Sequence, residues 1–216
     1  MADDVAEMAA GHQRFKAARL SDQEFLTALA EGKQQPKMLW IGCADSRVDP
    51  AEILGTGLGD LFVVRNIANV VPCAGAGDDS VGAAIEYCLE HLGVDDIVVC
   101  GHTGCGGIAA VSRSVRPSEV HLDRWVGHAR ASARLIAAAG VPDDQRLDAT
   151  VRANILFQRD NLLTYPSVGR ALAEGRLRLH AWLYDMRSAD MLGYDVASGD
   201  WLTLAELAGE ARKVPT

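Results

Sequence analysis

The sequence has no apolar run long enough to cross a bilayer, although 49% of its 216 residues are hydrophobic. A spanning helix needs about 20 consecutive apolar residues. The first residues, 1 to 7, are acidic where a secretory signal would be basic and then apolar. We therefore expect no membrane association and a cytoplasmic location.

Positive charge is also scarce, with 21 Lys and Arg against 29 Asp and Glu and a formal net charge of −8. Nucleic acids and anionic membranes are bound by an excess of Lys and Arg on one face, so we predict neither as a partner. A small anion could still be held by local arginines. The five cysteines are too few and odd in number for a disulfide scaffold, which leaves core thiols or metal ligands in a reducing compartment.

No internal repeat, low-complexity tract or linker divides the chain, and its length suits one substantial core. We predict a single domain over 1–216, with an N-terminal helical arm (1–33), an α/β core that carries the site (34–200) and a C-terminal helix and tail (201–216). Alternating strands and helices predict an α/β fold with a mostly parallel central sheet flanked by helices.

Helical spacing of apolar residues predicts an amphipathic helix over 3–17, whose narrow apolar stripe could pack on a partner subunit. Ser21 followed by Glu24 predicts a capping box that begins a second helix, ending near Gly32. The other predicted helices cover 50–54, 80–92, 120–139, 145–163, 166–174 and 203–212. The predicted strands cover 37–43, 61–64, 95–101, 176–184 and 191–196, the second and third of them buried.

Residues that can serve as soft metal ligands lie at or just after the ends of two of these strands. Cys43 ends the first, while His102 and Cys105 follow the third in a glycine-rich loop. Open α/β sheets bind ligands at the carboxyl ends of their strands, and two thiolates with one imidazole suit zinc and leave a fourth position for water. The alternatives are inert packing of the cysteines and a phosphate-binding loop, although the glycine spacing fits no nucleotide fingerprint.

Asp45 and Arg47 alternate directly after Cys43 and can face each other across a tight loop. An adjacent arginine keeps a carboxylate ionised and oriented, as an acceptor for a reacting hydroxyl requires. Without catalysis the pair would be an ordinary surface salt bridge. Cys88 and Cys100 are expected to be packing residues and Cys73 a loop residue, and no proton-shuttling histidine can be chosen from the sequence.

The segments 43–47 (CADSR) and 101–107 (GHTGCGG) resemble the β-class carbonic anhydrases. The similarity includes 62–71, 84–87 and 161–166, and it covers most of 30–190. It implies reversible hydration of CO2 to bicarbonate and a proton, by attack of a zinc-bound hydroxide. The implied metal is one Zn2+ per subunit, held by Cys43, His102 and Cys105. Asp45 would accept the hydrogen bond of that hydroxide while Arg47 holds Asp45 in place.

The same resemblance implies a CO2 pocket shared between subunits, and hence a homodimer or a homotetramer built from dimers. The residues that match this pocket are Gln34, Phe62, Ile67, Tyr87 and Gly104. The alternative is plain core for the three larger apolar residues and a solvated loop position for the glutamine.

Trp40, Arg65 and Tyr184 resemble a bacterial subgroup that binds a second, noncatalytic bicarbonate. In that subgroup Asp45 can take the fourth zinc position, an off state that lower pH would favour. The alternative is that Trp40 simply packs beneath the sheet, and the segment 161–166 looks more like the plant branch. Two other functions stay open: hydrolysis of CS2 or COS, and noncatalytic bicarbonate sensing, against which the intact Asp45 and Arg47 argue.

Overall fold

The computed structural model describes residues 2–111, 113, 116 and 118–211, and it separates into two compact units, Met1–Gln35 and Pro36–Thr216. This boundary lies close to the predicted end of the helical arm, while the assignment of the whole chain to one domain stays a prediction. In the part of the chain that is described, no helix is both long enough and apolar enough to cross a membrane.

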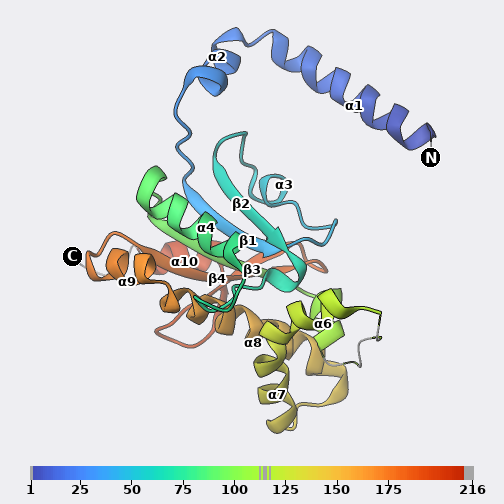
Figure 1. Cartoon of the computed structure of the whole chain (residues 1–216), viewed down its shortest axis with the longest axis vertical. Coiled ribbons are helices and arrows are strands. Elements are labelled where there is room, and N and C mark those ends of the chain that lie inside the picture. The colour runs from blue at the N-terminus through green and yellow to red at the C-terminus, as the bar shows by residue number, and fades with distance from the viewer. Residues whose placement is uncertain (1, 112, 114–115, 117, 212–216) are drawn as a thin grey trace. The chain divides into compact units, whose positions relative to one another are not determined.

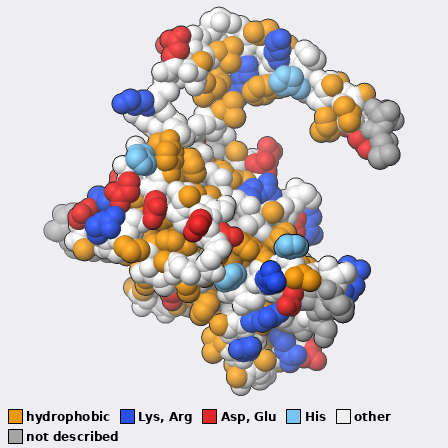
Figure 2. All heavy atoms as spheres, in the orientation of Figure 1, with side chains coloured by type: hydrophobic (Ala, Val, Ile, Leu, Met, Phe, Trp, Pro, Cys, Tyr) orange, Lys and Arg blue, Asp and Glu red, His pale blue; other side chains and the backbone are white. Residues whose placement is uncertain are grey.

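The first unit consists of two helices, α1 (Ala2–Leu20) and α2 (Gln23–Glu31). The apolar stripe predicted for the first helix is exposed, with Val5 71% accessible, and hydrophobic side chains are visible on the surface of this unit (Figure 2). The prediction that Ser21 caps the second helix is wrong. The Asp22 carboxylate accepts the Phe25 N–H at 2.9 Å, because it lies one position closer to that free amide, and Ser21 donates its hydroxyl hydrogen to the Ala18 carbonyl.

A six-stranded sheet forms the centre of the second unit, in the order β2-β1-β3-β4-β5-β6. Its strands are β1 (Met38–Cys43), β2 (Leu61–Asn66), β3 (Asp96–His102), β4 (Arg178–Asp185), β5 (Asp190–Tyr194) and β6 (Trp201–Thr203). Figure 1 labels the first four of these strands. The pairings among the first four are parallel, and β5 and β6 add antiparallel pairings at one edge. The predicted mostly parallel α/β sheet is thus confirmed, although β6 was not predicted.

The helices of this unit are α3 (Pro50–Leu54), α4 (Asp79–Tyr87), α5 (Gly106–Val111), α6 (Val120–Val126), α7 (Arg130–Ala138), α8 (Asp143–Asn161), α9 (Pro166–Ala173) and α10 (Leu204–Ala211). The helix predicted over 120–139 is interrupted by a 3-10 turn at Gly127–Ala129. The helix predicted over 80–92 ends in a π-helical turn, Cys88–Leu92, which Gly93 closes in the left-handed conformation (φ 66°).

The two faces of the sheet are buried to different extents. On one face, strand residues such as Leu39 and Val99 join a large core with side chains of α4, α5, α8 and α9. The other face carries a small cluster around Trp40, Val98 and Cys100. The predicted burial of β3 is confirmed.

The predicted burial of β2 is wrong within a single chain. Among the described residues, β2 is an edge strand that pairs only with β1, and alternate side chains stay accessible, with Val63 41% exposed. Local sequence cannot distinguish a central strand from an edge strand, because both can be equally apolar.

Candidate metal centre

The three predicted metal ligands meet at the carboxyl ends of two neighbouring strands. Cys43 is the last residue of β1 and His102 the last residue of β3, and these strands pair in parallel. Cys105 lies in the turn between β3 and α5. The three ligand atoms lie within 4.8 Å of one another, and all three residues are buried. Parallel pairing therefore explains why positions about sixty residues apart converge.

Glycines allow the chain to turn sharply around these ligands. Gly104 adopts a left-handed conformation (φ 67°), which other residues adopt at a cost in strain. At Gly101 a Cβ atom would lie 2.7 Å from Cγ1 of Ile155, so α8 could not pack as closely against β3. The glycines of this segment thus meet steric needs of the turn and of the helix packed behind it.

The donor atoms fit a zinc ion. The sulfurs of Cys43 and Cys105 lie 3.8 Å apart, and two ligands of a tetrahedral ion at the usual zinc–sulfur distance of ~2.3 Å would be separated by roughly 3.8 Å. Nδ1 of His102 lies 3.0 Å from the Thr103 carbonyl, which favours a hydrogen on Nδ1 and a lone pair on Nε2. Nε2 is buried and has no hydrogen-bond partner among the described residues, as expected of a metal ligand.

The two thiols influence each other's ionisation. The hydrogen bond from Cys105 lowers the pKa of Cys43, against the opposing effect of burial. The same contact and burial raise the pKa of Cys105. Burial acts to lower the pKa of His102, but the nearby Cys43 sulfur and its negative charge outweigh burial and raise it.

Asp45 and Arg47 form a two-pronged ion pair beside the ligands. Arg47 donates from Nε to Oδ1 of Asp45 at 2.9 Å and from Nη2 to Oδ2 at 2.7 Å, and its backbone N–H also donates to Oδ1 at 3.0 Å. These hydrogen bonds lower the pKa of Asp45, so the carboxylate is ionised at neutral pH. Oδ2 also lies 3.7 Å from Nε2 of His102, so this ionised oxygen borders the ligand group.

The residues predicted to line a CO2 pocket are only partly brought together. The rings of Phe62 and Tyr87 lie 5.9 Å apart. Ile67 follows β2 and approaches the glycine-rich segment, where its Cγ2 would be 2.8 Å from a Cβ on Gly107. Gly104 lies in the ligand turn, and Gln34 belongs to the other unit. Their role in binding CO2 stays a prediction.

The three residues predicted to bind a second bicarbonate lie along β1, β2 and β4. Trp40 is fully buried and packs edge-on against Trp182, while Tyr184 borders the same cluster. The indole N–H of Trp40 has no acceptor among the described residues. Arg65 donates from Nε to the Cys43 carbonyl at 3.1 Å and from Nη2 to the Asp45 carbonyl at 2.6 Å. It therefore braces the loop that carries Asp45.

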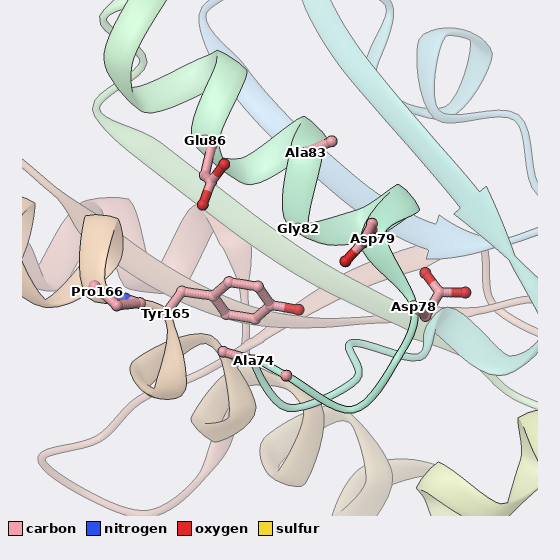
Figure 3. A pocket seen from close by; sticks show the side chains of 9 residues that line it. Ala74, Asp78, Asp79, Gly82, Ala83, Glu86, Tyr165 and Pro166 are labelled. Carbon is pink, nitrogen blue, oxygen red and sulfur yellow. The ribbon is translucent and has the colours of Figure 1, made fainter.

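A separate hollow of about 240 Å³ lies between α4 and the start of α9. Asp78, Asp79 and Glu86 point around it beside the ring of Tyr165 (Figure 3). The Tyr165 hydroxyl donates to the Pro72 carbonyl at 2.7 Å. None of the predicted site residues lines this hollow, so it is distinct from the Cys-His-Cys group.

Sequence reasoning missed the support behind the ligands. Three buried amides, Asn154, Gln158 and Asn161, lie on one face of α8 and bond to the segment after β2. Their spacing of four and three residues is visible in the sequence and places the three amides on one face of a helix. Amides buried on such a face need polar partners, so this spacing could have predicted the contacts.

The fold and the ligand group together define an α/β protein with a candidate metal centre of the open, three-ligand kind. The chain belongs to the carbonic anhydrase family, which its residues 38–191 match, and its relatives of known structure place it in the β class.

Two relatives show how far the similarity extends. The chain is 42% identical to a carbonic anhydrase of Pseudomonas aeruginosa over 81% of its own length and 80% of the relative's. It is 36% identical to carbonic anhydrase 1 of Escherichia coli O157:H7 over 93% of both chains.

Solved structures agree. The β-carbonic anhydrase CcaA superposes with a TM-score of 0.88 at 34% identity, covering 93% of this chain and 99% of that one. A tetrameric β-carbonic anhydrase of Sordaria macrospora gives a TM-score of 0.80 at 31% identity, covering 89% of this chain and 97% of that one.

Proposed function

We propose that this protein is a zinc enzyme that catalyses the reversible hydration of CO2 to bicarbonate and a proton. The observation that carries the proposal is the meeting of Cys43, His102 and Cys105 beside an ionised carboxylate, in a chain of the carbonic anhydrase family. A zinc ion held by these residues would supply a water of lowered pKa, and thus a hydroxide nucleophile close to neutral pH. Because two thiolates add negative charge, we expect activity to rise on the alkaline side.

Asp45 and Arg47 orient the nucleophile in this proposal. Oδ2 of Asp45 accepts the hydrogen of the attacking hydroxyl group and so directs an oxygen lone pair toward the carbon of CO2. Arg47 holds both carboxylate oxygens, which fixes the rotation of the carboxylate and keeps it unprotonated. CO2 would lie against the apolar side chains of Phe62, Ile67 and Tyr87, near Gly104, with the Gln34 amide as a hydrogen-bond donor.

The assembly proposed is a homodimer, or a homotetramer built from dimers. The exposed stripe of α1 and the edge strand β2 are apolar surfaces that a second copy could cover. The arm formed by α1 and α2 would pack on the partner subunit and carry Gln34 toward the partner's site. A mass measurement on the full chain in solution tests this proposal, and a monomer at micromolar concentration would contradict it.

A second bicarbonate at Trp40, Arg65 and Tyr184 would regulate the enzyme. The buried N–H of Trp40 has no acceptor among the described residues, which supports an acceptor from the bound anion at this position. Because Arg65 braces the backbone of Asp45, an anion that recruits Arg65 would release Asp45 from Arg47 toward the fourth metal position. We expect Trp40→Phe and Arg65→Ala to abolish inhibition by bicarbonate and to keep the zinc. Unchanged inhibition in both variants would contradict the switch.

Stopped-flow CO2 hydration tests the main proposal. The zinc-loaded protein is assayed from about pH 6.5 to about pH 9, before and after removal of the metal by a chelator. We expect hydration that rises with pH and disappears with the zinc. Release of hydrogen sulfide from COS or CS2 without CO2 hydration would favour a hydrolase, and bicarbonate binding without turnover would favour a sensor.

A further inference from the structure

We propose that Asn154 is a positioning residue of the metal centre, which it supports through the backbone of Ala68. This inference rests on the proposed zinc site. Asn154 lies on α8, is fully buried and is far from the ligands in sequence. Its side chain holds the turn after β2, and that turn packs against Gly101 and Gly107, which lie on either side of His102 and Cys105.

The turn is strained. Ala68 (φ 64°, ψ 27°) and Asn69 (φ 47°) both adopt the left-handed conformation, which is uncommon outside glycine. Two consecutive residues of this kind persist only where the surrounding structure holds them. Ala68 is fully buried, so solvent cannot satisfy its carbonyl group.

Asn154 supplies the missing partner. Its Nδ2 donates to the Ala68 carbonyl at 3.1 Å. Its Oδ1 accepts from Nε2 of Gln158 at 3.0 Å, and this second bond fixes which end of the amide faces the turn. Gln158 in turn accepts the Val71 N–H at 2.8 Å, so the same face of α8 also anchors the chain after the turn.

The turn packs against the segment that carries two of the ligands. A Cβ atom on Gly107 would lie 3.1 Å from the backbone nitrogen of Ala68, and one on Gly101 would lie 3.2 Å from Oδ1 of Asn69. Because Gly101 and Gly107 lie on either side of His102 and Cys105, the position of the turn limits where these two ligands can lie. If the Ala68 carbonyl lost its donor, the residue would relax toward negative φ and the turn would no longer hold this segment in one position.

The test compares two buried positions on α8. Asn154→Leu removes the donor at nearly constant shape. Thr150→Val is the matched control, because Thr150 is equally buried but its hydroxyl donates within the helix, to the Arg146 carbonyl. We expect the zinc dissociation constant, measured by chelator competition, to rise roughly 10- to 100-fold in Asn154→Leu and to stay unchanged in Thr150→Val. The thiolate-to-metal band of the cobalt-substituted protein should shift in the first variant only.

A second substitution separates positioning from general damage. Glycine adopts the left-handed conformation without strain, so Ala68→Gly combined with Asn154→Leu should recover most of the lost zinc affinity. This double variant decides the matter even if Asn154→Leu alone fails to fold. Wild-type affinity in Asn154→Leu, or a folded double variant that still binds zinc weakly, would overturn the inference. A wild-type protein that binds no zinc would overturn the proposed function along with it.

Discussion

Replacing Asp45 by asparagine tests the proposed chemistry at a single atom. Oδ1 of Asp45 accepts two hydrogen bonds from Arg47, at 2.9 and 3.0 Å, and Oδ2 accepts one more at 2.7 Å. The single oxygen of an asparagine would take the Oδ1 position, because two donors converge there. Its amide nitrogen would then replace Oδ2, where it would oppose Nη2 of Arg47 and offer the nucleophile a donor instead of an acceptor.

The expected loss can be worked out from one bond. A hydrogen bond to a charged group contributes about 1.5–3 kcal/mol, and each ~1.4 kcal/mol of transition-state stabilisation changes the rate tenfold. We therefore expect kcat/KM for CO2 hydration to fall by roughly 10- to 150-fold in Asp45→Asn, with the zinc content unchanged. Because Arg47 lowers the pKa of Asp45 far below the assay range, the ratio of the two rates should be the same at every pH.

Asp96 provides a matched control. Arg178 donates two hydrogen bonds to the Asp96 carboxylate in the same way, from Nε to Oδ1 at 2.8 Å and from Nη2 to Oδ2 at 2.6 Å. Asp96 lies at the amino end of β3, away from the ligands. Asp96→Asn should leave kcat/KM unchanged. If Asp45→Asn kept wild-type activity, or if both variants lost the same amount, the carboxylate would not orient the nucleophile and the reasoning would be refuted.

Three further predictions follow from packing and from pKa values. In a denaturant titration, Gly42→Ala should lower the free energy of unfolding by about 1–3 kcal/mol, because the new Cβ would lie 2.4 Å from Nε1 of Trp40. Gly106→Ala should lower it far less, because the space around Gly106 is open. Iodoacetamide at about pH 8 should label the exposed Cys73 in the native zinc-loaded protein and should not label Cys88 or Cys100. Burial raises the pKa of Cys88 to about 12 and also raises the pKa of Cys100, so both stay protonated. Mass spectrometry that finds Cys88 labelled in the folded protein would contradict this prediction. Burial raises the pKa of Tyr165 to about 12, so its proton stabilises the fold fully below the unfolded pKa of about 10 and progressively less as pH rises toward the folded value. The stability advantage of wild type over Tyr165→Phe should therefore shrink across that window, and a constant advantage would argue against a buried, protonated hydroxyl.

The sequence alone was sufficient to predict the four parallel strands and the meeting of Cys43, His102 and Cys105. Apolar, β-branched runs define β1 and β3, and Cys43 and His102 occupy their carboxyl ends. Because parallel neighbours end at the same edge of a sheet, that placement brings the two residues together without further information. The contact between Asp45 and Arg47 is equally local, since only Ser46 separates them along one tight loop.

The tertiary structure alone decided what surrounds that site. Alanine has no preference for the left-handed conformation, so the local sequence does not predict the turn at Ala68. The hydrogen bond that holds this turn comes from Asn154, 86 residues along the chain. The accessibility of β2 likewise depends on which strand lies beside it in the folded sheet. Strand and loop signals arise from interactions within a few residues, whereas conformations imposed by distant partners exist only once the chain has brought those partners together.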